Sequence, residues 1–365
     1  MLDTTKIKFM FGEETGEYNQ ALAKDVITNV LNRVTYCDKI VSKTLLNGEI
    51  VIETRFSYPR FFSWSNAYLI KSKDECMRVH KKLVGEIWNE VGLMQDIRTN
   101  EKIELGEWIN NNVRIKLTRV DIPFTYIMGD TESFKSYQTV YKVLGEVFKI
   151  KNKKCVPKEI KGDGEIQTIV LSNTANPNDY NSKLTIYNQA QKFKDYYKEK
   201  FPALVKLMKE SYPDLEQRIR MEVSKRVNRK EFTLEEFENF DIFTEYVRPY
   251  ARYILDNIFD DEVLEKVKEQ QIALLKEKLT AERKRNNFSY ENFIFYNYDI
   301  IYDWDILRRA IMETSSNENS GYQGTSIAKK ILAKLGQDRD IIYFGVFKKI
   351  ADMKKMISKY CKGGK

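Results

Sequence analysis

Three stretches of the sequence place a tyrosine and two carboxylates at matching positions of predicted strands. In LTRVDIPF, KLTIYN and RIRMEV, apolar residues alternate with polar ones, as in a strand that buries one face. Side chains two positions apart share a face, so Asp121, Tyr187 and Glu222 all point away from the apolar side. If the three strands are neighbours, a phenol and two carboxylates share one open surface. The basic residues predicted on the same polar face are Arg119, Lys183, Arg218 and Arg220.

A phenol among carboxylates and cations has the parts needed to attack a phosphate. Its ordinary pKa is near 10, so at neutral pH it is a poor nucleophile. A divalent cation and basic side chains would stabilise both the phenolate and the charge that develops on the phosphate. Carboxylate oxygens favour Mg²⁺ or Mn²⁺ as that cation. The same residue types also occur on an ordinary solvated strand face, which is the competing interpretation.

The histidine and cysteine content excludes several other chemistries. The only histidine, His80, lies among helix-spaced apolar residues and is expected to be a surface or half-buried helix residue. Two-histidine metal sites and most histidine-activated nucleophiles are therefore excluded for a single chain. No C-x-x-C pair occurs, which argues against a zinc site or disulfide framework and favours a reducing cytoplasm. The four cysteines are Cys37, Cys76, Cys155 and Cys361.

Length and charge set further limits. The chain has 365 residues, of which 42% are hydrophobic, so about two globular domains are expected. Its formal net charge of +8 permits a polyanionic partner without requiring one. No apolar stretch reaches the roughly 20 residues that span a bilayer, and no secretory signal is visible. No G-x-x-x-x-G-K-[ST] phosphate loop occurs either, so strand separation of a nucleic acid would need a partner.

The elements that must position these residues alternate between strands and helices in the first two-thirds of the chain. Helical periodicity covers residues 18–34, 74–91 and 132–148 and begins again near Gln189, whereas 150–164 is expected to be an exposed loop. Two sets of strand, helix, strand, strand, helix, strand predict an α+β fold. We expect a duplicated split βαβ (ferredoxin-like) arrangement with a largely antiparallel sheet. The predicted strands are TKIKFMFG, EIVIETRFSY, NAYLIKS, VRIKLTRVDIPF, IQTIVLSN, SKLTIYN and QRIRMEVSKRV.

Domain boundaries follow from where strand patterns stop. Residues 1–234 form a predicted α/β domain with an N-terminal half, 1–105, and a catalytic half, 106–234. Residues 235–365 form a predicted C-terminal helical module, with amphipathic helices at 261–284 and 304–312. Within it, residues 324–355 contain two helix patterns divided at Gly336. These are interpreted as two packed structural helices, with a helix-turn-helix DNA reader as the alternative.

The order of the polar strands resembles a known family of enzymes. It is similar to that of the rolling-circle replication initiators, which include the filamentous-phage gene II endonucleases and the plasmid Rep (Rep_trans-like) proteins. Their catalytic region has an R-[IV]-D strand, a helix, a turn-linked strand, a strand that ends in a Y-x-K-like motif and a later R-x-E strand. The corresponding stretches here are TRVDIPFT, GEIQTIVLSN, LTIYNQAQKF and RIRMEVSKR. They lie within residues 113–232, about a third of the chain.

The resemblance implies roles for individual residues. Tyr187 would be the nicking nucleophile, assisted by the cations Lys183 and Arg220. Asp121 and Glu222 would be candidate metal ligands. Glu165, just before the IQTIVL strand, is a further candidate for the same carboxylate group.

The motif departs from the family at one position. The family commonly has lysine two residues after the tyrosine, whereas this chain has Gln189. A cation that could help to neutralise the scissile phosphate is therefore absent at that position. Lys183 or Lys192 could supply the charge instead, which leaves the register of the active site open.

Taken together, these features predict a metal-dependent, strand-specific DNA nicking-closing endonuclease. It would initiate rolling-circle replication through a 5′-phosphotyrosine intermediate, with Mg²⁺ or Mn²⁺ as cofactor. Its expected partners are origin DNA, double- and single-stranded, and a helicase and polymerase of the host or element; no membrane is expected, and self-association is compatible with the sequence. The alternatives are a relaxase of a mobile element, a non-catalytic replication or DNA-binding protein, and an α+β protein whose resemblance is accidental.

Overall fold

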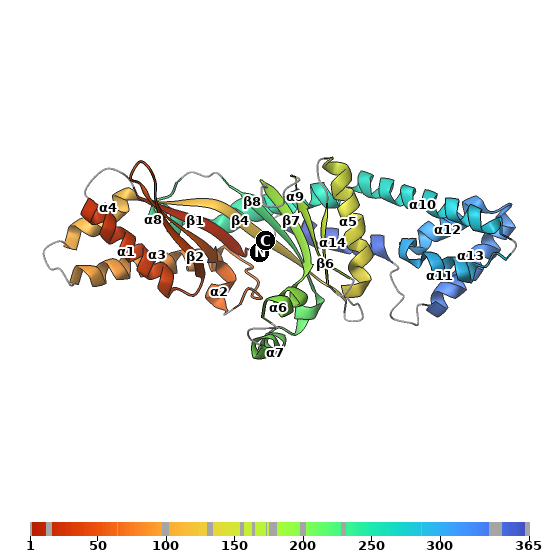
Figure 1. The fold of residues 1–365 in the computed structure, drawn as a ribbon, viewed down its shortest axis with the longest axis horizontal. Helices are drawn as coiled ribbons and strands as arrows, with labels where there is room; N and C mark the ends of the chain where they lie inside the picture. Colours follow the sequence, from red (N-terminus) through yellow and green to blue (C-terminus); the bar gives the residue numbers. More distant parts are fainter. Residues whose placement is uncertain are drawn as a thin grey trace.

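An antiparallel sheet of eight strands forms the middle of the protein (Figure 1). The computed structural model describes residues 2–11, 17–63, 65–96, 102–129, 134–153, 157–162, 165–172, 174, 181–197, 202–227, 231–285, 287–335 and 345–361. The strands, in the order β2-β3-β1-β4-β8-β7-β6-β5, are β1 (Thr4–Phe11), β2 (Cys37–Thr44), β3 (Ile50–Ser57), β4 (Val113–Ile127), β5 (Lys158–Gly162), β6 (Glu165–Ser172), β7 (Ser182–Asn188) and β8 (Arg218–Arg226).

The strand order confirms the predicted α+β class with a largely antiparallel sheet. The first four strands, in the order β2-β3-β1-β4, follow the split βαβ arrangement. The last four strands lie in consecutive order, so β8 separates β4 from β7. This position matters for the chemistry, because it makes β8 the neighbour of both β4 and β7.

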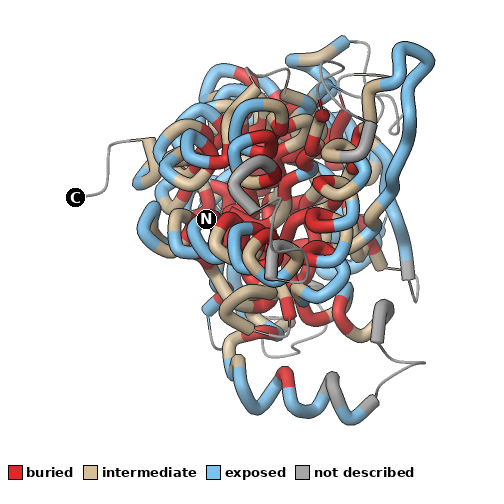
Figure 2. Tube along the Cα trace, turned by 90° about the vertical axis from the view of Figure 1, so that its left-hand side faces the viewer, coloured by how far each residue is buried: buried red, intermediate tan, exposed pale blue. Residues whose placement is uncertain are grey.

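Helices share their apolar core with one face of the sheet. The strands alternate buried and exposed residues, as in β1, because their side chains point to opposite faces. The apolar residues on the helix side form one continuous core that occupies the interior (Figure 2). The helices that contribute to it include α1 (Glu17–Arg33), α3 (Lys73–Asp96), α4 (Lys102–Asn112), α5 (Gln138–Lys151), α8 (Leu234–Glu238), α9 (Ile242–Ile258) and α14 (Val346–Cys361).

A second apolar core lies at the far end of α10 (Asp261–Arg283), which extends away from the sheet (Figure 1). This distal core is built by the end of α10 with α11 (Tyr290–Asn297), η3 (Tyr298–Ile300), α12 (Trp304–Thr314) and α13 (Glu318–Leu335). The predicted C-terminal helical region is thus confirmed. α13 packs against α11 and α12, whereas α14 packs against α9 and α5. The two helices expected to flank Gly336 therefore pack mainly in different cores; Gly336 itself lies outside the described residues.

Short elements complete the opposite side of the sheet. A small third cluster buries Ala67, Ala190, Phe193, Met208 and Leu215 together, separate from the main core. Its residues come from the segment after the short helix α2 and from the elements between β7 and β8. The elements between β7 and β8 are α6 (Gln189–Tyr197), α7 (Pro202–Ser211) and η2 (Pro213–Gln217). The helix α2 (Tyr58–Phe62) packs against the main core, and η1 (Phe134–Tyr137) precedes α5.

Three local predictions were wrong. NAYLIKS is not a strand, because its apolar residues are used by two different clusters: Ala67 by the third cluster and Ile70 by the main core. The expected loop at 150–164 contains β5, a charged strand at the edge of the described sheet, where it pairs with β6. His80 is fully buried rather than at the surface; its Nε2 lies 2.7 Å from the hydroxyl of Tyr58. Burial lowers the pKa of His80 to about 3, so this histidine is neutral at pH 7.

Candidate functional site

A cavity of about 540 Å³ opens on the sheet face opposite the main helices. Its floor is formed by the polar sides of β4, β8 and β7, and its lining includes Asp121, Tyr187 and Glu222. In the strand register, Tyr187 is directly opposite Arg220 and Thr185 is opposite Glu222. Directly opposite and diagonal partners on one sheet face are within reach of long side chains. The sheet therefore brings the predicted phenol and both predicted carboxylates to one cavity.

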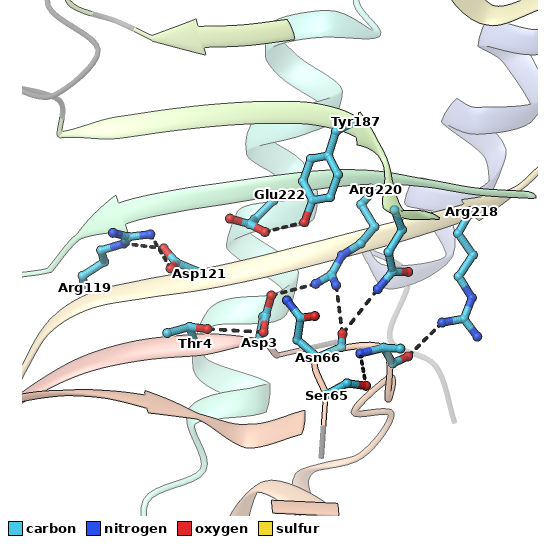
Figure 3. A network of polar contacts seen from close by, with 12 residues as sticks. Asp3, Thr4, Ser65, Asn66, Arg119, Asp121, Tyr187, Arg218, Arg220 and Glu222 are labelled. Atoms are coloured by element: carbon cyan, nitrogen blue, oxygen red, sulfur yellow. Dashed lines mark hydrogen bonds and ion pairs between the residues drawn. The ribbon is translucent and has the colours of Figure 1, made fainter. Parts of the chain in front are cut away.

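The phenol of Tyr187 contacts one of these carboxylates directly. Its hydroxyl donates a hydrogen bond of 2.9 Å to Oε2 of Glu222 (Figure 3). Tyr187 is only 1% exposed, yet it belongs to the polar cavity lining and not to the main apolar core. Burial, followed by the nearby carboxylates, raises the pKa of Tyr187 well above its ordinary value despite the opposing effect of Arg220. In this conformation the phenol is a neutral hydrogen-bond donor.

Glu222 is held in its charged form. Burial alone would raise the pKa of this carboxyl, but the charges of Lys192 and Arg220 and the Tyr187 hydrogen bond lower it to about 2. The amino group of Lys192, on α6, lies 3.8 Å from the centre of the Tyr187 ring. The same cations that keep Glu222 ionised are therefore placed to stabilise negative charge on the phenol oxygen.

Asp121 occupies a different electrostatic environment on β4. Arg119 binds both of its carboxylate oxygens, with Nε 2.7 Å from Oδ1 (Figure 3). Asp121 is 3% exposed, and this burial raises its pKa to about 6, although Arg119 opposes the shift. The two predicted carboxylates thus have pKa values displaced in opposite directions, a pattern that is frequent in functional sites and also occurs in structural ion networks.

Arg220 is fixed by contacts that the sequence pattern did not predict. Its guanidinium donates to Oδ2 of Asp3 at 2.8 Å and to the carbonyl of Asn66 at 3.1 Å (Figure 3). Arg220 is 1% exposed and Asp3 is 4% exposed, so this is a buried ion pair. The Nε of Arg220 has no acceptor among the described residues. The arginine is thereby oriented by the segment before β1 and by the irregular segment before α3.

The polar face of the sheet is covered here, which corrects the expectation of an open surface. Arg218 is buried as well; it donates to the carbonyl of Ala67 at 2.8 Å and pairs with Asp214. Gln189, at the first position of α6, is 1% exposed and donates to the carbonyl of Asn66 at 3.3 Å. The segment around Asn66 and α6 therefore form a roof over the site, packed together by the third apolar cluster.

The remaining predicted residues divide into those that line the cavity and one that does not. Lys183 lines it, and burial together with Arg119 lowers the pKa of this lysine. Lys192 lines it from α6, so a cation stands near the phenol although position 189 holds glutamine. Glu165 lies at the start of β6, three residues before the cavity-lining Thr168, and is not part of the lining. The structure thus groups Asp121 and Glu222 with Tyr187 but leaves Glu165 apart.

The N-terminal half extends the cavity with further cations. Lys39, Arg55 and Arg60 line it from β2, β3 and α2. Arg55 and Arg60 both pair with Asp38, whereas Lys39 is exposed. Lys39 has a φ of 55°, in the left-handed region that residues other than glycine rarely adopt, at an irregularity in the β2–β3 register. The local backbone thus gives this lysine an unusual direction at the mouth of the cavity.

The donor chemistry of the cavity suits a hard divalent cation. Asp121 and Glu222 offer carboxylate oxygens, which Mg²⁺ and Mn²⁺ prefer. Within the described ranges, no three His, Cys, Asp or Glu side chains are grouped as a metal centre. Mg²⁺ commonly takes one or two carboxylates and completes its shell with water and substrate phosphates. The two carboxylates fit such an ion if Arg119 releases Asp121.

The overall charge is concentrated in the part of the chain that contains the cavity. The whole excess of Lys and Arg over Asp and Glu falls within residues 1–234, and residues 235–365 contain equal numbers of each. Among the described helices, none is both long and apolar enough to cross a bilayer. The fold and cavity therefore define a class: an antiparallel α+β protein with a phenol, three carboxylates and several cations in one covered site.

Comparisons with known proteins give no closer assignment. Neither the known protein families, nor the curated proteins, nor the solved structures contain a match to this chain.

Proposed function

We propose that this protein is a DNA strand-nicking and strand-joining enzyme that uses Tyr187 as its nucleophile and initiates rolling-circle replication. The observation that supports the proposal most directly is the hydrogen bond of 2.9 Å from the Tyr187 hydroxyl to Glu222. It occurs inside a cavity lined by the cations Lys183, Lys192 and Arg220. A nucleophile, an adjacent base and groups that bind a phosphate are the parts that attack on a phosphodiester requires.

In the proposed activation of the phenol, Glu222 accepts the proton, and Lys192 and Arg220 control the pKa of Glu222. In the closed cavity, Lys192 and Arg220 lower the pKa of Glu222, which makes it a weak base. A bound phosphodiester places negative charge next to the same cations, which offsets their effect and raises the pKa of Glu222. The carboxylate then becomes a better acceptor for the phenol proton. Substrate binding would thereby switch on the base where it is needed.

The bond changes balance without an outside energy source. The Tyr187 oxygen forms a bond to phosphorus, the phenol proton passes to Glu222, and the bond from phosphorus to the 3′ oxygen breaks. The leaving oxygen takes up a proton and becomes a free 3′ hydroxyl. The protein is then joined to the 5′ phosphate, and attack by a 3′ hydroxyl on the phosphotyrosine reverses the step.

The closed conformation must open before DNA can bind. Tyr187 is 1% exposed and Arg220 is held by Asp3 and Asn66. The roof over them is formed by α6 and the segment around Asn66, which are joined by the small third cluster and by the hydrogen bond from Gln189 to the carbonyl of Asn66. Movement of this roof would uncover the phenol without disturbing the main core. The Nε of Arg220 would then be free to donate to a phosphate oxygen.

A divalent cation is part of the proposal. Asp121 and Glu222 would hold Mg²⁺ or Mn²⁺, Glu222 through Oε1 so that Oε2 remains the acceptor for Tyr187. The ion would polarise the phosphate oxygens as a Lewis acid when bound. Arg119 would shift from Asp121 toward the phosphate, so its positive charge would remain in the site. Glu165 is a weaker candidate for this role because it is not among the residues that line the cavity.

The surrounding charge favours a nucleic-acid strand as the substrate. Lys39, Arg55 and Arg60 continue the basic lining away from Tyr187, and the net positive charge lies within residues 1–234, which contain the cavity. Lys and Arg side chains along a groove bind successive backbone phosphates and fix the position of the strand. Origin DNA is therefore the proposed substrate. A separate helicase and polymerase would open and extend the nicked duplex.

The test is formation of a covalent protein–DNA adduct. The purified chain is incubated with Mg²⁺ or Mn²⁺ and a pool of random-sequence single-stranded oligonucleotides labelled at the 3′ end, then separated under denaturing conditions. We expect a labelled adduct whose phosphotyrosine maps to Tyr187 by peptide mass spectrometry. Tyr187→Phe should form no adduct but retain DNA binding. Tyr212→Phe, which removes a hydroxyl bonded to Ser63 at 3.0 Å in the roof, is the matched control and should remain active.

The outcomes separate the alternatives. DNA binding without any adduct would overturn the enzymatic proposal and favour a non-catalytic DNA-binding protein. An adduct that persists in Tyr187→Phe would assign the nucleophile to another residue. A relaxase shares the tyrosine chemistry, and rolling-circle replication is distinguished from DNA transfer by whether the nicked strand primes synthesis on a circular template.

A further inference from the structure

A second basic pocket lies on the other side of β8, between this strand and α9. Its volume is about 470 Å³, and its lining consists of Lys225, Arg248, Pro249, Arg252, Tyr253 and Asp256. Because consecutive strand residues point to opposite faces, Lys225 faces α9 while the neighbouring Glu222 and Ser224 positions belong to the cavity side. The two pockets therefore share one strand as their common wall.

Lys225 is held in this pocket by aromatic rings. Its amino group lies 4.2 Å from the ring centre of Tyr253 and 5.0 Å from that of Tyr250. The side chain is half-buried, and burial lowers the pKa of this lysine. Cation–π contacts orient an ammonium group but do not neutralise its charge. Lys225 forms no ion pair with any described residue, so the pocket keeps an unneutralised positive charge.

Two arginines extend this charge along α9. Arg248 and Arg252 are four residues apart, so they lie on one face of the helix and about 6 Å apart along its axis. Both are exposed, and neither pairs with an acidic side chain in the described part of the chain. One acidic residue, Asp256, lines the pocket beside three cations. The pocket is thus open and basic, and its two arginines are spaced along the helix like contacts to successive phosphates.

We propose that Lys225, Arg248 and Arg252 bind backbone phosphates of duplex DNA beside the strand that enters the tyrosine cavity. The biological role of this site rests on the proposed function, whereas the binding site itself is inferred from the positive charges that line the pocket. The exposed fork-shaped guanidinium groups suit phosphate oxygens, and a row along a helix suits a polymer better than a single free anion. Contacts of this kind position a duplex without reading its sequence.

The experiment measures duplex binding against salt concentration. A labelled random-sequence duplex is titrated with the full chain and with the double variant Arg248→Gln/Arg252→Gln between 50 and 200 mM salt, reading fluorescence anisotropy. Loss of two phosphate contacts lowers the slope of log affinity against log salt by about 2 and weakens binding about tenfold at the upper end. The matched control is Lys329→Gln/Lys330→Gln on α13, which removes the same charge from exposed positions. It should bind like the unmodified chain.

A second arm separates this proposal from the enzymatic one. Adduct formation on single-stranded oligonucleotides should be unchanged in Arg248→Gln/Arg252→Gln, because neither residue lines the tyrosine cavity. A smaller salt slope in the double variant, with adduct formation retained, supports the duplex site whether or not replication is the biological role. An unchanged slope in the double variant would overturn it. So would inorganic phosphate that lowers the duplex affinity of the unmodified chain at concentrations that leave the affinity of Arg248→Gln/Arg252→Gln unchanged, since this would assign the pocket to a free anion.

Discussion

The hydroxyl oxygen of Tyr187 lies 2.9 Å from Oε2 of Glu222, on adjacent strands of one sheet face. This contact predicts that Glu222→Gln slows adduct formation by about 10²–10⁴-fold, the usual loss when a proton acceptor is removed. Because the phenol would then ionise without help, the remaining rate should rise with pH through the alkaline range. Single-turnover rates between pH 6 and 10 check this. Glu210→Gln, at an exposed position on α7, is the control and should leave the rate unchanged.

Asp121 predicts a specific pH dependence of stability. Its pKa rises from 3.8 in the unfolded chain to about 6 in the fold, so the folded protein binds this proton more tightly. The resulting stabilisation is fully present below pH 3.8 and is lost as the pH rises through 6. Between pH 4.5 and 7 this group should cost about 2 kcal/mol of unfolding free energy.

Asp121→Asn should remove this dependence. Urea unfolding at pH 4.5, 5.5, 6.5 and 7 measures it in both proteins. The unmodified chain should lose about 2 kcal/mol of unfolding free energy relative to Asp121→Asn between pH 4.5 and 7, because the amide resembles the protonated acid and does not titrate. A difference between variant and unmodified chain that stays constant over this range would show that Asp121 does not titrate there.

The buried pair of Asp3 and Arg220 predicts a large loss of stability on truncation of the acid. Asp3→Ala leaves the guanidinium of Arg220 buried without its counterion, which typically costs about 3–5 kcal/mol. Asp352→Ala, at an exposed position of α14, should change the unfolding free energy by less than about 0.5 kcal/mol. Chemical denaturation of both variants at one pH measures the difference. A loss below about 1 kcal/mol for Asp3→Ala would mean that water reaches Arg220.

Lys192 should supply the positive charge beside the phenol that Gln189 does not. Lys192→Met keeps an apolar stem over the Tyr187 ring but removes the charge that lies 3.8 Å from its centre. A loss of about 1 kcal/mol of charge stabilisation corresponds to adduct formation about five to ten times slower. Lys194→Met on the same helix is the control. Equal rates for both variants would contradict this role.

The positions of the phenol and the two carboxylates could be predicted because strand alternation is a local property. Val120, Ile122 and Phe124 are all buried, so the neighbouring Asp121 had to face the other side. The order of the strands also carried information, since β4, β7 and β8 had to be neighbours for the motifs to meet. The structure meets this condition, with β8 between β4 and β7.

The partners that complete the site could not be predicted in the same way. Asp3 reaches Arg220 only because β1 lies beside β4 and β4 beside β8, across more than 200 positions of sequence. Asn66 acts through its backbone carbonyl, which leaves no signature in the residue type. Polar side chains predicted to face solvent are buried because a segment with no regular structure covers them. Periodicity predicts which side chains lie on each face of a strand or helix. It does not predict which other segment of the chain covers that face.

Because the roof is held together by the separate third cluster, it should open at a lower temperature than the rest of the fold. Its five buried apolar residues, Ala67, Ala190, Phe193, Met208 and Leu215, form a far smaller group than those that hold the sheet and main helices together. Regions with few buried contacts open at lower free-energy cost than the global fold. On heating, amides around Asn66 and α6 should therefore exchange with solvent before those of β4 and β8. Adduct formation through Tyr187 should be lost while the sheet is still intact. Inactivation below the unfolding midpoint would then be reversible on cooling.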